Sequence, residues 1–144
     1  MTAAAETRDN PTIGTDQIRA INRTAAFNRW AGIEVERAES GEAVLTLRWR
    51  EELGQYAGFL HAGMIGALID TACGFAAATL VGRVLASNCQ VSFFAPAVGE
   101  RFVARARVVK AGRRQVFTAA ELFAATDTEE RLVAGGSTIL MTAQ

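Results

Sequence analysis

The feature that most constrains this chain is residues 56–82, a stretch that is apolar apart from one acid. Asp70 is the only charged residue between Glu52 and Arg83, and His61, the only histidine of the chain, precedes it by nine residues. Burying an ionised carboxylate among apolar side chains costs free energy unless it is paired or hydrogen-bonded. The stretch therefore predicts a buried element around an acid that is either satisfied by a partner or functional.

The same stretch is long enough to raise the question of a membrane span. Asp70 at its midpoint would cost roughly 2.5–3.5 kcal/mol on insertion. The stretch is also rich in glycine, and few basic residues flank it. We therefore expect no membrane, and instead one long helix over residues 61–80 that other elements cover on most sides. Each of its glycines costs about 1 kcal/mol of helix propensity, so tertiary packing must hold it together.

The rest of the chain shows one helical pattern and several alternating ones. Residues 15–31 predict a helix with Thr15 or Asp16 as its cap. Residues 33–38 and 43–49 predict two strands joined by a turn at 40–41. Four further strands, expected to continue as an antiparallel meander, fall at residues 84–94, 100–110, 115–124 and 132–141, with core positions for Phe93, Phe94, Phe117 and Phe123. This order predicts an α+β domain in which the long helix covers one face of the sheet.

Composition places the chain among single-domain proteins without a polyanion partner. The 144 residues suit one domain, and 15 basic residues balance 15 acidic ones, so we expect no nucleic acid. Residues 1–14 are polar and lack the pattern of a signal peptide, so we expect partial disorder there and a single domain over 15–144. Cys73 and Cys89 match no metal spacing and are expected to be reduced core thiols of a cytoplasmic protein.

Three local strings add a family resemblance. The first is GFLHAG at residues 58–63, followed by LID at 68–70. The second is VSFFAPA at 91–97, and the third is ARVVKAGRR at 106–114. In order and spacing they resemble the G-x-x-H-G-G…L-x-D signature, the N-F-x-x-P-A strand and the A-x-V-x-x-x-G-R/K turn of PaaI-type acyl-CoA thioesterases. The resemblance runs from about residue 27 to the end and implies a hotdog fold, an antiparallel sheet wrapped around a long central helix.

The resemblance also implies an activity and a set of site residues. It implies hydrolysis of an acyl-CoA thioester to a free acid and CoA, with no metal or cofactor. The family's catalytic acid falls on Asp70, as general base or nucleophile, and its backbone oxyanion donor falls on Ala62. The family's asparagine falls on Gln55, which keeps an amide but adds a methylene. His61 is expected to orient or to serve the helix start rather than to carry protons.

A polar helper found in some relatives aligns near Ala86, which has no suitable side chain. Asn88 lies two residues further along the predicted strand and would share its face. We therefore expect Asn88 as a possible substitute for this helper.

Helix geometry constrains how these groups can act together. Backbone N–H groups in the first turn, those of Ala62 and Gly63, can stabilise the negative charge that develops on a thioester carbonyl oxygen. Nine residues of helix place Asp70 roughly 13 Å along the axis from His61. One chain cannot bring both ends to one carbonyl, so the spacing predicts a homodimer with a shared active site. The family implies the same, and commonly a dimer of dimers.

The coenzyme A half of the substrate carries phosphates and needs cations. Arg113 and Arg114, with Lys110 nearby, form the best local cluster, and arginine binds phosphate in a bidentate way. Two alternatives remain open: a hotdog hydroxyacyl thioester dehydratase and a non-catalytic acyl-CoA-binding protein. The acyl group itself is not fixed by these patterns.

Overall fold

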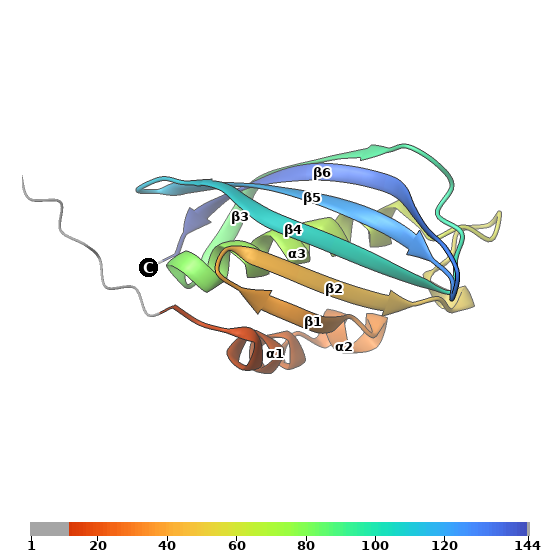
Figure 1. The fold of residues 1–144 in the computed structure, drawn as a ribbon, viewed down its shortest axis with the longest axis horizontal. Helices are drawn as coiled ribbons and strands as arrows, with labels where there is room; N and C mark the ends of the chain where they lie inside the picture. Colours follow the sequence, from red (N-terminus) through yellow and green to blue (C-terminus); the bar gives the residue numbers. More distant parts are fainter. Residues whose placement is uncertain (1–11, 144) are drawn as a thin grey trace, which may run out of the picture.

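The structure, a computed structural model, describes residues 12–143. Residues 1–11, most of the segment expected to be disordered, lie outside the described residues. The elements in chain order are α1 (Thr15–Thr24), α2 (Ala26–Ala31), β1 (Glu34–Glu39), β2 (Glu42–Arg48), a short 3-10 turn η1 (Glu51–Leu53), α3 (Ala62–Val81), β3 (Val84–Phe93), β4 (Arg101–Ala111), β5 (Gln115–Ala125) and β6 (Glu130–Thr142) (Figure 1).

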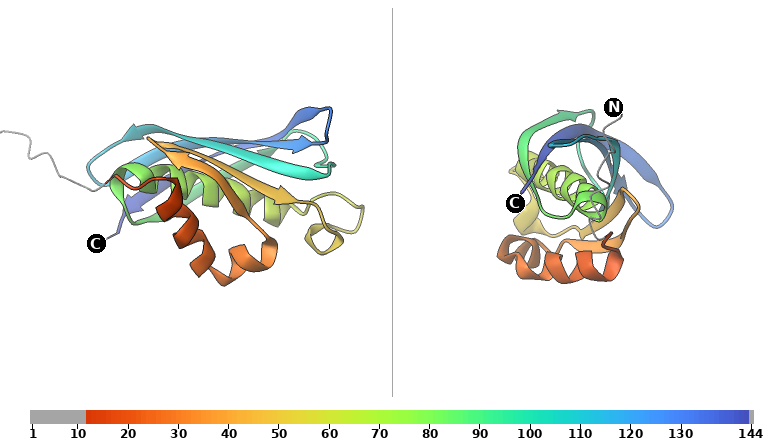
Figure 2. Two further views of the ribbon diagram at one scale, coloured as in Figure 1. Left: turned by 60° about the horizontal axis from the view of Figure 1, so that its bottom comes forward. Right: turned by 90° about the vertical axis from the view of Figure 1, so that its left-hand side faces the viewer.

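The six strands form one antiparallel sheet in the order β1-β2-β4-β5-β6-β3. The sheet curls around α3, while α1 and α2 lie beyond the edge formed by β1 (Figure 2). This confirms the α+β class and the hotdog fold. The expected four-strand meander is wrong in one respect, because β3 crosses the sheet to pair with β6 and only β4, β5 and β6 follow one another. Alternating residues specify a strand but not its neighbour.

The central helix α3 confirms the long helix expected from the sequence, with His61 as its N-cap. By length and composition α3 could cross a membrane, yet more than half of its most apolar window is buried inside the fold. Leu68, Ile69, Ala72, Cys73 and Ala76 have no exposed surface. The helix is apolar on most sides because it forms the core of this domain.

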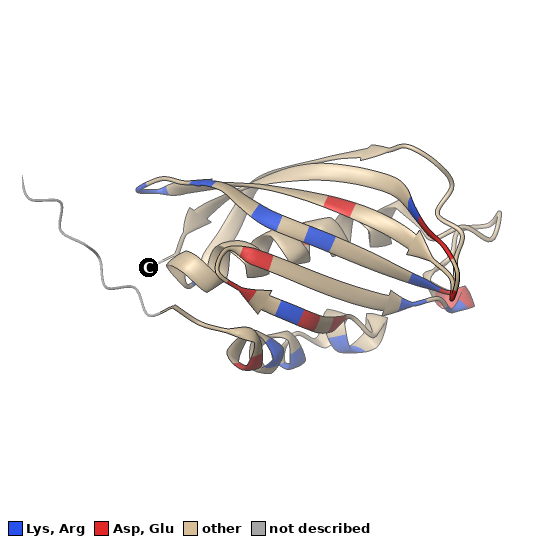
Figure 3. Ribbon diagram, viewed as in Figure 1, with Lys and Arg blue, Asp and Glu red and all other residues tan. Residues whose placement is uncertain are grey.

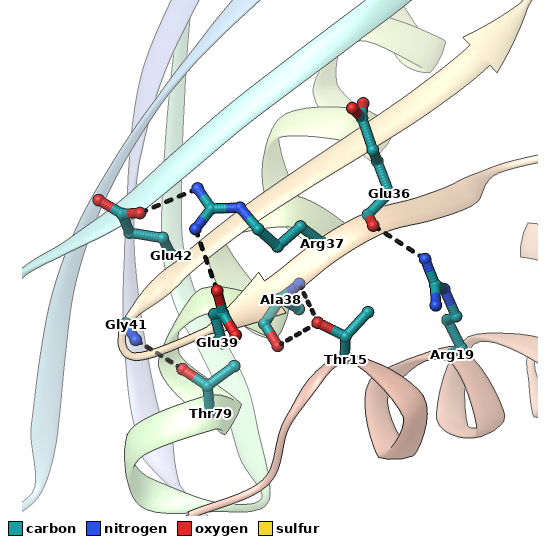
Figure 4. Close-up of polar contacts among 9 residues, drawn as sticks. All are labelled: Thr15, Arg19, Glu36, Arg37, Ala38, Glu39, Gly41, Glu42 and Thr79. Carbon is teal, nitrogen blue, oxygen red and sulfur yellow. Dashed lines mark hydrogen bonds and ion pairs between the residues drawn. The ribbon is translucent and has the colours of Figure 1, made fainter.

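The hairpin between β1 and β2 is fixed to the far end of α3. Ser40 and Gly41 both have positive φ, 51° and 81°, as a two-residue hairpin turn requires. The Gly41 N–H donates to Thr79 Oγ1 over 2.8 Å (Figure 4). The Thr79 hydroxyl in turn donates to Ala76 O. The expected turn is therefore confirmed, and a buried hydroxyl ties it to the core helix.

The expected single N-terminal helix is two helices. Ala25, with φ −86° and ψ 115°, is extended and separates α1 from α2. The cap prediction is also wrong, since Gly14 is the N-cap and its N–H donates to Gln17 Oε1. Thr15 instead uses its hydroxyl on the edge of β1, where it donates to Ala38 O and accepts from Ala38 N–H (Figure 4).

Two expectations for the core are wrong, and both concern the sheet surface. Cys73 is buried, but Cys89 lies exposed on β3. Phe93, Phe94 and Phe117 are exposed instead of forming the sheet core. Cys89 and Phe93 lie on β3, an edge strand that has a neighbouring strand on only one side among residues 12–143.

Candidate active site

Asp70 lies in the wall of a groove between α3, the N-terminal helices and the start of β3. The groove has a volume of about 560 Å³, and Thr71, Phe75 and Val84 line it beside the acid. The carboxylate is half-buried, and it has neither a hydrogen bond nor an ion pair with any residue from 12 to 143. Loss of hydration on burial raises the pKa of Asp70 above its ordinary value. Asp70 is thus a half-buried acid that no residue from 12 to 143 pairs with.

The start of α3 leaves one backbone donor open. His61 Nδ1 accepts the Gly63 N–H over 2.8 Å, so this nitrogen carries no proton. His61 O accepts the N–H groups of Met64 and Ile65. Within the described part of the chain the Ala62 N–H has no acceptor. Of the two amides expected to face a substrate, Gly63's is occupied by the histidine ring, and Ala62's is open.

Gln55 belongs to the same end of the molecule. It lines a hollow of about 530 Å³ together with His61, Ala62, Phe93 and Phe94. Its side-chain oxygen accepts a hydrogen bond from the Ala57 N–H within the loop before α3. The amide nitrogen is therefore the part of Gln55 that remains available to donate.

The two hollows are separate within one chain. α3 runs without a break from Ala62 to Val81, so Asp70 lies about 12 Å further along the helix axis than Ala62. The hollow at the helix start and the groove at Asp70 share no lining residue. The described chain thus brings Gln55, His61 and Ala62 together but keeps Asp70 apart from them.

The argument that placed Asn88 beside Ala86 is wrong. Ala86 pairs with Leu140 and Asn88 pairs with Ile139, so Ser87 is an extra residue in β3. This β-bulge shifts the alternation by one. Leu140 is buried against the core, and Asn88 pairs with its neighbour, which points to the opposite face of the sheet. Asn88 is exposed and does not share the face of Ala86.

The basic cluster lies at the tip of the β4–β5 hairpin (Figure 3). Arg113 and Arg114 line a hollow of about 870 Å³ with Phe117 and Met141, while Lys110 is exposed nearby. None of these three cations has an acidic partner among residues 12–143. The cluster is therefore free to meet an anion.

Backbone hydrogen bonds connect this hairpin with the mouth of the groove. The Thr142 N–H donates to Arg114 O, and the Ala143 N–H donates to Arg83 O. Arg83 in turn lines the groove that contains Asp70. The cationic hairpin thus lies at the same end of the sheet as Arg83, which lines the groove of Asp70.

Cys73 lies one turn after Asp70 and is fully buried. Burial raises the pKa of its thiol, which disfavours the nucleophilic thiolate. This agrees with the expected packing role.

Sequence reasoning did not identify the residues that form the N-terminal wall of the groove. Ile13, Ile21 and Asn28 line it opposite α3. The only signal was the presence of two buried amides, Asn22 and Asn28, within the helical pattern. A helical pattern does not show which other element its face will meet.

The fold and the two hollows define a hotdog domain with an unpaired acid and an open helix-start amide on its central helix. A family model described as the thioesterase superfamily matches residues 57–130, just over half of the 144 residues. The chain belongs to the thioesterase superfamily. This membership supports the hydrolysis of a thioester as its general activity.

Solved structures agree with this assignment. A thioesterase family protein from Silicibacter pomeroyi is 35% identical, with a TM-score of 0.84 over 88% of this chain and 95% of that one. A variant of the phenylacetic acid degradation protein PaaI from Thermus thermophilus is 28% identical, with a TM-score of 0.73 over 83% and 100%. Zebra fish thioesterase superfamily member 2, 23% identical with a TM-score of 0.80 over 91% and 99%, shares the fold.

Proposed function

We propose that the protein hydrolyses an acyl-CoA thioester to a carboxylic acid and CoA, with Asp70 as the catalytic carboxylate. The observation that carries this proposal is the half-buried Asp70, which has no partner among the described residues although it lies in a groove large enough for an acyl group. A structural acid in such surroundings would be paired, because an unpaired buried charge is costly. A catalytic base gains from the same surroundings, because desolvation raises its basicity.

We further propose that the active site is shared between two copies of the chain, joined along β3. Eight of the ten β3 residues are exposed, among them Leu85 at 70% and Phe93 at 54%. The strand contains no charged residue and no proline. An exposed edge without such protection favours pairing with another strand. The occupant proposed here is a second copy in antiparallel orientation.

Such pairing would join the two hollows. Val84, Leu85 and Ala86, at the start of β3, line the groove of Asp70. Phe93, at the end of β3, lines the hollow of Ala62. Antiparallel pairing about the middle of β3 sets the start of one strand against the end of its copy. Asp70 of one protomer would then face the helix start of its partner.

The chemistry follows from this arrangement. The Ala62 N–H, at the positive end of the α3 dipole, would bind the thioester oxygen as it gains negative charge. Asp70, as base, would take a proton from water while the water oxygen bonds to the carbonyl carbon. The C–S bond then breaks, and the CoA sulfur leaves with the proton. Direct attack by the Asp70 carboxylate, followed by hydrolysis of the anhydride, remains the other route. Gln55 and His61 would orient the carbonyl and the helix start.

Arg113, Arg114 and Lys110 are proposed to bind the CoA phosphates. Support comes from their lack of acidic partners among the described residues and from the position of the hairpin near Arg83 at the groove mouth. The bidentate fork of arginine suits a phosphate. A dimer of dimers stays a prediction, which analytical ultracentrifugation would test.

The first experiment measures release of free thiol from a panel of aryl, short-chain and long-chain acyl-CoAs. Asp70→Asn should lower kcat/KM by about a hundred- to ten-thousand-fold, because the amide cannot accept the proton. Cys73→Ser, which changes a buried thiol one turn away, is the matched control and should keep most of the activity. The proposal fails if no thioester is hydrolysed or if Asp70→Asn retains full rate. Binding without turnover would favour an acyl-CoA-binding protein, and hydration of an enoyl thioester would favour a dehydratase.

The second experiment tests the shared site through Ala62→Pro. Proline is well tolerated at the first position of a helix, and His61 already has the extended backbone that precedes proline. The substitution removes only the open N–H, and we expect a loss of about a hundred- to a thousand-fold in kcat with little change in stability.

Mixing the two inactive variants then separates a shared site from a site within one chain. In a mixed dimer of Asp70→Asn and Ala62→Pro, one of the two shared sites retains both groups. After subunit exchange, about a quarter of the wild-type activity should return. A mixture that stays inactive while mass spectrometry shows mixed dimers would exclude the shared site.

A further inference from the structure

The groove that contains Asp70 is also lined by a polar side chain that the proposed reaction does not use. Its walls are largely apolar, with Ile13, Ile21, Phe75 and Leu140. Asn28, on the short helix α2, also lines the groove and is only 9% exposed. No fully buried side-chain oxygen or nitrogen of the described residues lacks a hydrogen-bonding partner, so any atom of this amide without a partner lies open to the groove or to water.

The orientation of this amide is fixed by a chain of hydrogen bonds. Ile33 O can only accept, and it accepts from Asn22 Nδ2 over 2.8 Å. The Asn22 oxygen therefore points the other way and accepts from Asn28 Nδ2 over 2.9 Å. Flipping either amide would set two acceptors or two donors against each other. Asn28 must accordingly turn its nitrogen toward Asn22.

The consequence is an acceptor without a donor. Among the residues that the structure describes, the side-chain oxygen of Asn28 receives no hydrogen bond. The Asn22–Asn28 pair thus fixes the position of a carbonyl oxygen on a residue that lines the same groove as the proposed catalytic acid. A leucine or phenylalanine would be the ordinary choice for a wall that contacts only a hydrocarbon chain.

We propose that Asn28 is a specificity-determining residue, and that the acyl group of the substrate carries, in addition to its thioester, a hydrogen-bond donor, a hydroxyl or an amide N–H. This inference rests on the proposed thioesterase function and names the chemistry of its acyl group. A donor on the acyl group would satisfy the Asn28 oxygen, whereas an unsubstituted chain would bury that oxygen without a partner.

The test compares pairs of acyl-CoAs from butanoyl to decanoyl, each with and without a terminal hydroxyl. Wild type should prefer the hydroxylated member at the best-fitting length by about ten-fold in kcat/KM, the value of one neutral hydrogen bond. Asn28→Leu should abolish or reverse this preference. Thr71→Val, which removes another polar side chain of the same groove, should change the rates without changing the preference.

A second variant controls for destabilisation, because Asn28→Leu leaves the buried Asn22 oxygen unpaired. The double variant Asn22→Leu with Asn28→Leu removes both amides and should also lose the preference. If thioesters are hydrolysed but wild type shows no preference, or if the preference survives both variants, the inference is wrong and the proposed function stands. If no member of any pair is hydrolysed, the proposed function itself fails.

Discussion

The two edges of the sheet are built in opposite ways. β1 has the sequence Glu-Val-Glu-Arg-Ala-Glu, whereas β3 contains no charge in ten residues. Figure 3 shows charged residues along β1 and on the neighbouring α1, and others spread over β2, β4, β5 and the ends of the sheet. Charged side chains are a common way to protect a sheet edge from pairing. The composition of the two strands alone therefore predicts that β1 is protected from pairing with another strand and that β3 is not. We call β1 the closed edge and β3 the open edge.

The backbone of β1 is covered as well. Arg19 donates from Nε to Val35 O over 3.0 Å and from a terminal nitrogen to Glu36 O over 2.9 Å. Thr15 satisfies both backbone groups of Ala38 (Figure 4). The polar side chains of α1 thus take the place of a neighbouring strand. No helix within residues 12–143 does the same for β3, whose ends instead line the two hollows of the candidate site. The uncovered edge is therefore the one that lies beside the candidate site.

The largest effect is expected from a charge placed on the open edge. In a symmetric pair, Asn88→Lys near the middle of β3 would bring two like charges together across the two-fold axis. We expect loss of the dimer and, because each site needs both protomers, a fall in activity of about a thousand-fold. Size-exclusion chromatography with light scattering, run beside the thiol-release assay, would measure both.

Glu34→Lys is the matched control, since it places the same new residue on the exposed face of the closed edge. It should leave assembly and activity near wild type, because surface substitutions without partners rarely matter. A fully active monomer of Asn88→Lys would contradict the role assigned to β3. Dissociation by Glu34→Lys would show that the two edges do not differ as proposed.

A smaller effect is expected from opening the closed edge. Arg19→Ala removes two hydrogen bonds to β1 carbonyls and should lower the free energy of unfolding by about 1–3 kcal/mol. Arg23→Ala, on the same helix, removes an exposed arginine without a side-chain partner among the described residues and should change it by less than about 0.5 kcal/mol. Denaturant titration of both variants measures the difference. Equal stability would mean that α1 does not protect this edge.

The sequence predicted the elements of the fold well because their patterns are local. The apolar residues around Asp70 predicted a helix at 61–80, and α3 spans Ala62–Val81. Strand positions followed from alternation in the same way. The place of β3 beside β6 and the extra residue at Ser87 were not predictable, because both depend on pairing between distant segments. The break at Ala25 also has no sequence signal, since alanine favours helix.

The same difference between local patterns and contacts among distant segments applies to the candidate site. Asp70 stood out as the lone charge of an apolar stretch, whereas Ala62 was expected only because the family resemblance places a backbone donor there. The use of the Gly63 N–H by His61 depends on a side-chain rotamer, and the unpaired oxygen of Asn28 depends on three residues from two helices and the chain before β1. Such relations appear only in three dimensions.

The smallest effect concerns the pH dependence of stability. Burial raises the pKa of Asp70 above its ordinary value of 3.8. Well below that value the carboxyl is neutral in both states and costs nothing. As the pH rises, the unfolded chain ionises first, so the folded state loses stability until the pH passes the raised pKa of Asp70. Asp70→Asn should therefore raise the free energy of unfolding at neutral pH and leave it unchanged in acid.

Measuring this gain in the free energy of unfolding by urea denaturation also tests whether a second copy covers β3. If a second copy covers β3 and closes the groove, Asp70 is less hydrated in the dimer than in a single chain. The gain from Asp70→Asn should then shrink in the monomeric Asn88→Lys background, and the acid limb of the pH–rate profile of wild type should lie above the ordinary pKa of aspartate. An equal gain in both backgrounds would mean that pairing along β3 leaves the surroundings of Asp70 unchanged, which the shared site does not allow.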